Sequence, residues 1–165
     1  MQRRQLDTAT GYLEQGLAIS REVGDRPNQG SALSDLGRVA LQRRQYQAAE
    51  GYLEQALAIS REVDDRRWGA KSLCTLGLVA EAQDDLVRAE TMLRQSLTIA
   101  TELDLGPEIA DAQLALGRLL AERLERRDEG CPLLLEAARR YAEMGMPEAE
   151  EARAVIAQVG CAAEE

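Results

Sequence analysis

Three cysteines, Cys74, Cys131 and Cys161, are the side chains best suited to chemistry in a chain of 165 residues that contains no histidine. Without histidine, neither a serine nor a cysteine nucleophile can be activated in the usual way. Structural zinc normally needs four cysteine or histidine ligands, which this chain cannot supply alone. The odd number and wide spacing of the cysteines predict reduced thiols and a cytoplasmic location. We therefore expect no enzymatic activity, no metal and no cofactor.

Charge and hydropathy argue against two further classes of partner. The formal net charge is −9, and arginine pairs such as Arg43 and Arg44 lie among acidic residues. A protein that binds nucleic acid needs a positive face that releases counterions from phosphate, so no nucleic acid is expected as a partner. No apolar run approaches the ~20 residues of a membrane span, and the N-terminus lacks the apolar segment of a secretory signal. The sequence predicts a soluble protein without a membrane partner.

The chain repeats itself at a step of forty residues. Residues 11–26 and 51–66 are identical except at two positions, where Gly16 and Gly24 correspond to Ala56 and Asp64. A period of this size indicates stacked copies of one small unit, each contacting mainly its neighbours. Hydrophobic residues make up 45% of the chain but aromatic residues only 3%, and strong helix formers dominate. The copies should therefore be helical, with an aliphatic core.

Each copy contains two helical patterns. Apolar residues at spacings of three and four predict one helix over residues 27–44 and a second over 46–63. The expected fold is all-α, an α-α superhelix of about eight helices in one domain. Its parts are a half repeat at 6–25, repeats at 27–65 and 67–105, a degenerate repeat at 107–145 and a capping helix at 147–161. In the degenerate repeat, Pro132 is expected near the position that Met92 occupies in the preceding copy.

The residue pattern resembles the tetratricopeptide repeat, a family whose usual period is about 34 residues. The period alone would also suit HEAT or armadillo repeats. The resemblance rests on a large residue, a Leu-Gly pair, a small residue that opens the second helix, a second large residue and a further small one. These residues are Leu33, Leu36, Gly37, Ala49, Leu53 and Ala56 in one copy and Leu73, Leu76, Gly77, Ala89, Leu93 and Ser96 in the next. The third copy keeps Leu116 and Gly117. The long variant is similar to arrays in bacterial regulators, signalling ATPases and kinesin light chains.

This resemblance implies a concave groove, lined by the first helices, that takes a peptide or helix of a partner protein. The implied groove residues are Ser31, Ser34, Arg38, Lys71, Cys74, Leu78, Glu81, Asp111, Leu114, Arg118 and Glu122. Chaperone-binding members hold a terminal carboxylate with lysine and asparagine at positions that here carry Ser34 and Arg38, so that clamp is not carried over. Arg38 and Arg118 could still grip a carboxylate with two hydrogen bonds, or could pair with acids of their own chain.

Two other functions stay open at this point. No partner helix precedes the first predicted helix, so the chain is either a piece of a longer array or docks a second copy of itself. In the second case Tyr12, Leu13 and Leu17 would form the contact of a homodimer or of a self-assembling scaffold. A small-molecule sensor with a cavity inside the superhelix is the third alternative.

Overall fold

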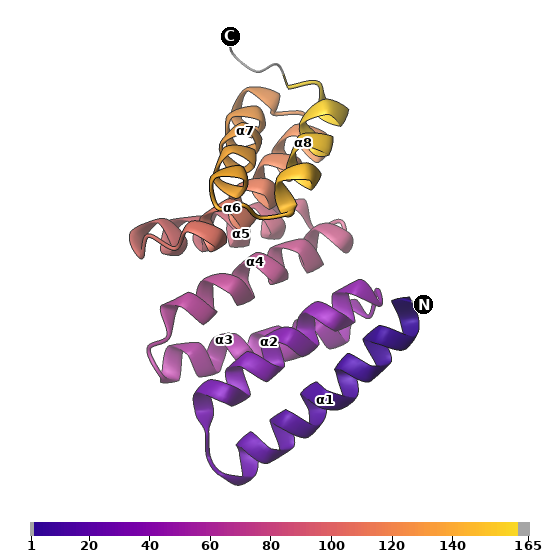
Figure 1. Cartoon of the computed structure of the whole chain (residues 1–165), viewed down its shortest axis with the longest axis vertical. Helices are drawn as coiled ribbons and strands as arrows, with labels where there is room; N and C mark the ends of the chain where they lie inside the picture. The colour runs from indigo at the N-terminus through magenta and orange to yellow at the C-terminus, as the bar shows by residue number, and fades with distance from the viewer. Residues whose placement is uncertain (1, 162–165) are drawn as a thin grey trace.

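The computed structural model describes residues 2–161, with side chains from residue 6 onward, and within that part the chain is all-α. Its helices are α1 (Gln2–Glu22), α2 (Arg26–Gln42), α3 (Tyr46–Glu62), α4 (Arg66–Ala82), α5 (Leu86–Glu102), α6 (Gly106–Arg118), the π-helix η1 (Leu119–Arg123), α7 (Arg127–Glu143) and α8 (Glu148–Val159). They stack along one long axis, with the two termini far apart (Figure 1). Each helix packs on the next, and α4 also contacts both α2 and α6. The array is the expected solenoid, in which neighbouring helices bury the core.

A residue in the left-handed conformation follows the helices at regular intervals and sets the length of the repeat. Positive φ angles recur every twenty residues at Gly24, Arg44, Asp64, Asp84 and Asp104. After three of these turns an aspartate caps the next helix, because its carboxylate accepts a hydrogen bond from the backbone N–H three residues later. These caps are Asp25, Asp65 and Asp85. Two helices and two such turns give the forty-residue period.

The degenerate repeat contains one extra residue, which the forty-residue pattern does not predict. The left-handed residue after Asp104 is Glu125, twenty-one positions later instead of twenty. The extra residue falls in η1, where the last turn of the first helix widens into a π-helix. A π-helical turn holds one more residue than an α-helical turn, so it absorbs an insertion without breaking the helix.

The insertion shifts the register of α7 by one residue. A Cβ atom placed on Gly77 would meet Leu93, whereas one placed on Gly117 would meet Leu134, which lies forty-one positions after Leu93. Pro132 is therefore one position away from its expected place. It lies inside α7 and not at the start of a helix.

Glycine facing leucine lets the paired helices approach closely. A Cβ atom on Gly37 would lie 2.5 Å from Cγ of Leu53, and one on Gly77 would lie 2.6 Å from Cγ of Leu93. Both leucines are fully buried. At such distances nothing larger than hydrogen fits without a shift of the neighbouring helix. The small residue of the Leu-Gly pair has the packing role that the sequence predicts.

A disulfide joins the last two helices. Cys131 near the start of α7 and Cys161 just after α8 are bonded, with 5.4 Å between their Cα atoms. They meet because the two helices are antiparallel neighbours, and they pack beside the buried residues Leu134 and Val159. The expectation that all three cysteines are reduced is wrong for this pair, while Cys74 is a free thiol.

The outward face of α8 is polar, as expected for a capping helix. Ala149 and Ala152 are buried against the preceding helices. On the other side, Nη1 of Arg153 lies 2.6 Å from Oε1 of Glu150, and both side chains are more than half exposed. None of the large apolar side chains exposed within residues 6–161 belongs to α8.

Candidate functional site: a groove between the first helices

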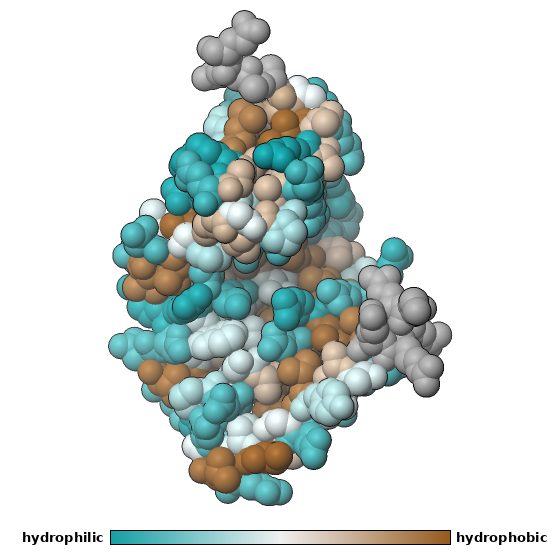
Figure 2. Space-filling model, in the orientation of Figure 1, coloured by the Kyte–Doolittle hydropathy of each residue, from teal (hydrophilic) through white to brown (hydrophobic). Residues whose placement is uncertain are grey.

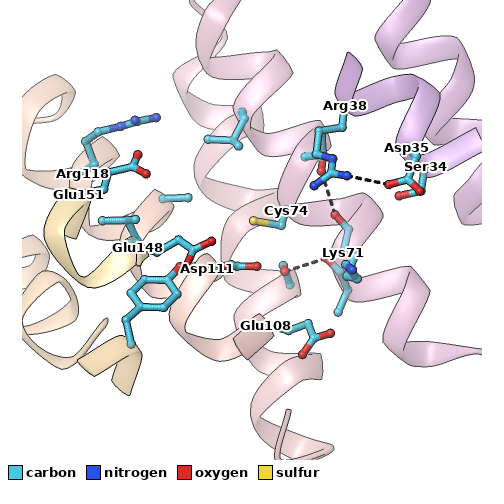
Figure 3. A pocket seen from close by; sticks show the side chains of 17 residues that line it. Ser34, Asp35, Arg38, Lys71, Cys74, Glu108, Asp111, Arg118, Glu148 and Glu151 are labelled. Atoms are coloured by element: carbon cyan, nitrogen blue, oxygen red, sulfur yellow. Dashed lines mark hydrogen bonds and ion pairs between the residues drawn. The ribbon is translucent and has the colours of Figure 1, made fainter. Parts of the chain in front are cut away.

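A groove with a cavity of about 270 Å³ runs between the first helices of successive repeats (Figure 3). It brings together eight of the eleven implied groove residues: Ser34, Arg38, Lys71, Cys74, Leu78, Asp111, Leu114 and Arg118. Ser31, Glu81 and Glu122 do not line it, although Glu81 contacts a residue that does. Helices α2, α4 and α6 supply most of the lining, because each presents the same face of its repeat. The ends of the groove are completed by α7 and α8, which contribute Tyr141, Glu148 and Glu151.

The two groove arginines are paired within the chain. Nη2 of Arg38 lies 3.0 Å from Oδ1 of Asp35 on the same helix, and the Arg38 side chain is 66% exposed. Nη2 of Arg118 lies 3.2 Å from Oε2 of Glu81, whose side chain is only 12% exposed. The exposed pair contributes little to stability, so Arg38 can exchange Asp35 for another acid at low cost. Arg118 is different, because its loss would leave a largely buried carboxylate unpaired.

Lys71 is held by an aromatic ring. Its Nζ lies 4.8 Å from the centroid of the Trp68 ring, one helical turn earlier. This contact is a cation–π interaction. In Figure 3, Lys71 lies on the groove wall near Arg38, across from Glu148 and Glu151.

The α6–α8 side of the groove is acidic. Most of its acidic residues are not among the groove positions that the family resemblance implies. Glu108 and Glu148 each lie in the first turn of their helix, forty residues apart. Both line the groove beside Asp111. Tyr141 donates a hydrogen bond from its hydroxyl to Oδ1 of Asp111, at 2.6 Å. Of these four residues only Asp111 is an implied groove position. The repeat pattern does not identify Glu108 or Glu148, because the insertion in η1 makes the step forty-one residues here and not forty. Tyr141 lies on a second helix.

The local environment changes the acidity of two groove side chains. Removal from bulk water raises the pKa of the Asp111 carboxyl, and the Tyr141 hydrogen bond opposes this effect. The negative charges of Glu108 and Glu148 raise it further, while the nearby Lys71 lowers it. Burial, with the charge of Asp111 second, raises the pKa of the Cys74 thiol to about 12. Cys74 is therefore a neutral thiol at physiological pH and a poor nucleophile.

Two other features, a metal centre and a membrane-spanning helix, are absent from the described residues. Within residues 6–161 no group of three or more Cys, Asp or Glu side chains is arranged to hold a metal ion. Among the described helices, none is both long and apolar enough to cross a bilayer. Basic side chains are neutralised locally, as where Arg43 pairs with Asp7 and Arg126 with Glu90 and Glu129.

The implied self-association residues do not share one face of α1. Leu17 is only 5% exposed and packs with Leu33 and Leu36 of α2, and Leu13 packs partly against the same cluster. The expectation that Leu13 and Leu17 are free to dock a second copy is therefore wrong. The uncovered apolar side chains are Tyr12, Ile19 and Val23, which are 72%, 54% and 71% exposed. A hydrophobic patch is visible over the end of α1 at the bottom of Figure 2.

The same face of the next copy is covered. The corresponding residues are Tyr52, Ala56 and Ile59 of α3 and Val63 directly after it, and all four pack in the cluster formed with α2. Ala56 and Ile59 are buried there. The face of α1 thus has the composition of a helix-contact surface, but no described helix lies on it.

Comparisons with known proteins agree with this architecture. A model of the family described as "Tetratricopeptide repeat" matches residues 1–62 and 45–102. A search of curated proteins gives no match. The crystal structure of BtubC (BKLC) from P. vanneervenii is similar with a TM-score of 0.70 and 23% identity, over 86% of this chain and 58% of that one. The chain thus spans less than two thirds of that protein.

A second similar structure is a putative kinesin light chain from Podosopora anserina with nearly identical TPR-like repeats. Its TM-score is 0.65 at 22% identity, over 96% of this chain and 87% of that one. These identities support the fold alone. The family match covers more than half of the chain, and the Leu-Gly packing and the stacked helix pairs fit it. The chain therefore belongs to the tetratricopeptide repeat family.

Proposed function

We propose that the groove between α2, α4, α6 and α8 binds a peptide segment or a helix of a partner protein. Tetratricopeptide repeats are generally protein-interaction modules. The observation that carries the proposal for this chain is the cavity itself, which six of its helices line with both charged and apolar side chains. A concave surface with a few polar groups around an apolar floor is the usual form of a binding site.

The floor and the walls of the groove have different chemistry. Leu78 and Leu114 are half-buried and give apolar contact area, and Ala70, Cys74 and Ser96 keep the floor shallow. Arg38 is exposed, and its guanidinium can donate two hydrogen bonds to a partner carboxylate when its ion pair with Asp35 breaks. We infer a binding role and not catalysis, because the chain has no histidine and the thiol of Cys74 is protonated.

A pair of threonine substitutions tests the groove. Thr75 lines it and donates to the Lys71 carbonyl at 3.2 Å, whereas exposed Thr91 on α5 donates to the Val87 carbonyl at 2.8 Å and lies outside it. Peptides selected from a random displayed library against the native protein should lose binding to Thr75→Arg. They should keep binding to Thr91→Arg, which adds the same side chain elsewhere. Equal binding by both variants in isothermal titration would remove the groove from the proposal.

We propose homodimer formation as a second candidate function, with another copy of the chain seated on the uncovered face of α1. The face carries Tyr12, Ile19 and Val23 around Gly16, where an added Cβ atom would meet nothing within 4 Å. Small residues at such a centre let two helices approach closely. Sedimentation should show a concentration-dependent dimer that Ile19→Glu abolishes and Ala18→Glu, at an exposed position outside this face, does not. A monomer at every concentration would exclude this function.

The cytoplasmic location stays a prediction. The disulfide between Cys131 and Cys161 argues against it, because such bonds persist mainly in oxidising compartments. Alkylation of thiols at the moment of cell lysis decides the question. Reduced Cys131 and Cys161 would support the cytoplasm, and a bonded pair would contradict it.

A further inference from the structure

Two carboxylate oxygens at the acidic end of the groove are buried without a hydrogen-bond donor among the described residues. They are Oε2 of Glu108 and Oε2 of Glu148. Glu108 as a whole is 5% exposed, yet it lines the cavity. A buried charged oxygen that lacks a partner is costly, so its presence in a groove indicates that a donor arrives from outside.

The cations of the chain do not fill this role. Arg67 donates from Nε to the other oxygen of Glu108, Oε1, at 2.8 Å and leaves Oε2 free. Arg38 and Arg118 are bonded to Asp35 and Glu81. Lys71 also lines the groove, but its ammonium lies over the Trp68 ring.

Most of the acidic side chains that line the groove lie at one end of it. The equivalent position in successive first helices is Ser31 in α2, Lys71 in α4 and Asp111 in α6, so the charge changes from neutral to positive to negative along the stack. Beyond Asp111, α8 adds Glu148 and Glu151. These acids repel one another: the negative charges of Glu108 and Glu148 both raise the pKa of the Asp111 carboxyl. A cation bound there would relieve this repulsion.

We propose that the end of the groove formed by Glu108, Asp111 and Glu148 is a subsite for a positively charged side chain, arginine or lysine, of the bound peptide. This inference rests on the proposed function of the groove. An arginine carries five N–H donors on a planar fork, which suits several carboxylate oxygens from different helices. The hydrogen bond from Tyr141 fixes the orientation of Asp111 within the subsite. A metal ion is a poorer fit, because the described acids are not arranged as a ligand cluster.

The test uses peptides that bind the native protein but not Thr75→Arg. We expect these peptides to share an arginine or a lysine. Replacing that arginine with citrulline, or that lysine with norleucine, should weaken binding about tenfold or more, the usual loss for a charge-assisted hydrogen bond. In Glu148→Gln the same replacement should cost much less. Glu150→Gln is the matched control, because Glu150 lies on the outer side of α8 and is bonded only to Arg153.

The possible outcomes separate the inference from the proposed function. If no selected peptide is sensitive to Thr75→Arg, the groove proposal fails and the subsite fails with it. If such peptides bind without a basic residue, or if Glu148→Gln and Glu108→Gln leave the citrulline effect unchanged, only the subsite is wrong. Arginine amide alone should bind far more weakly than the peptides. Equal affinity would show that the subsite serves a small molecule and not a peptide. Circular dichroism of each variant verifies that it is folded.

Discussion

Replacing Gly77 by alanine should destabilise the fold, although alanine is the better helix former. A Cβ atom at this position would lie 2.6 Å from Cγ and 2.9 Å from Cδ2 of Leu93, and 3.3 Å from the Ala89 carbonyl oxygen. The helix gains about 0.5–1 kcal/mol from the loss of glycine flexibility. Overpacking of a tight core costs about 1–3 kcal/mol. The net result is a loss of up to about 2.5 kcal/mol, and Gly77→Leu should lose more.

Gly51 provides the matched control. It also lies inside a helix, but an added Cβ atom would meet nothing within 4 Å. Gly51→Ala should therefore stabilise the protein by about 0.5–1 kcal/mol. Urea unfolding followed by circular dichroism measures both variants, with the slope of the transition showing whether they unfold by the same process. If Gly77→Ala were as stable as Gly51→Ala, the close approach of α4 and α5 would be refuted.

A double substitution tests the named contact directly. Leu93→Ala alone should cost about 2–5 kcal/mol, because it leaves a cavity in a fully buried site. Combined with Gly77→Ala, the loss should be smaller than the sum of the two single losses, since the new methyl group enters the space that Leu93 vacated. Strict additivity would show that the two side chains do not share this space.

Three further outcomes are expected. Replacing Cys131 and Cys161 together by serine should lower the free energy of unfolding by about 3–4 kcal/mol, as the chain-entropy estimate gives for a bond across 30 residues; no change in urea unfolding would mean that the bond does not form. Asp111→Asn should raise the free energy of unfolding at pH 7. Because the folded-state pKa of Asp111 is raised, its ionisation costs stability above the ordinary aspartate range, so the gain should vanish as the pH falls into that range; a loss at all pH values would contradict this. Cys74 should react slowly with iodoacetamide at pH 8 in the folded protein and readily after unfolding, since the pKa of its thiol is about 12.

Most of the fold follows from local sequence signals. The predicted helices over 27–44 and 46–63 correspond to Arg26–Gln42 and Tyr46–Glu62, and the capping helix predicted over 147–161 corresponds to Glu148–Val159. These helices are well specified because apolar spacing and turn residues agree, and Asp25 caps the first of them. The extra residue in η1 could not be read from that spacing, since the run of leucines through Leu119, Leu120 and Leu124 suits an α-helix equally well. The one-residue shift in register is visible only at the turns. Twenty positions after Asp104 the sequence has Leu124, and the left-handed residue is Glu125.

The site was less predictable, because it depends on which elements meet in space. Family positions identify the α2, α4 and α6 sides of the groove, but not Tyr141, which reaches Asp111 from the second helix of its pair. The disulfide likewise requires knowing that the start of α7 and the end of α8 are neighbours. On α1 the apolar residues form one sequence stripe but two spatial faces. Leu17 lies under α2, and Ile19 points to solvent.

The polar outer face of α8 limits how copies of this chain can associate. A head-to-tail polymer would require the exposed face of α1 on one molecule to cover the outer side of α8 on the next. There the Glu150–Arg153 ion pair would lose its water without gaining apolar contact in return. The proposed contact between two α1 faces avoids this cost, and a contact of that kind closes on itself after two molecules. If the dimer proposed through α1 forms, the charge on α8 favours a finite pair over an open fibre.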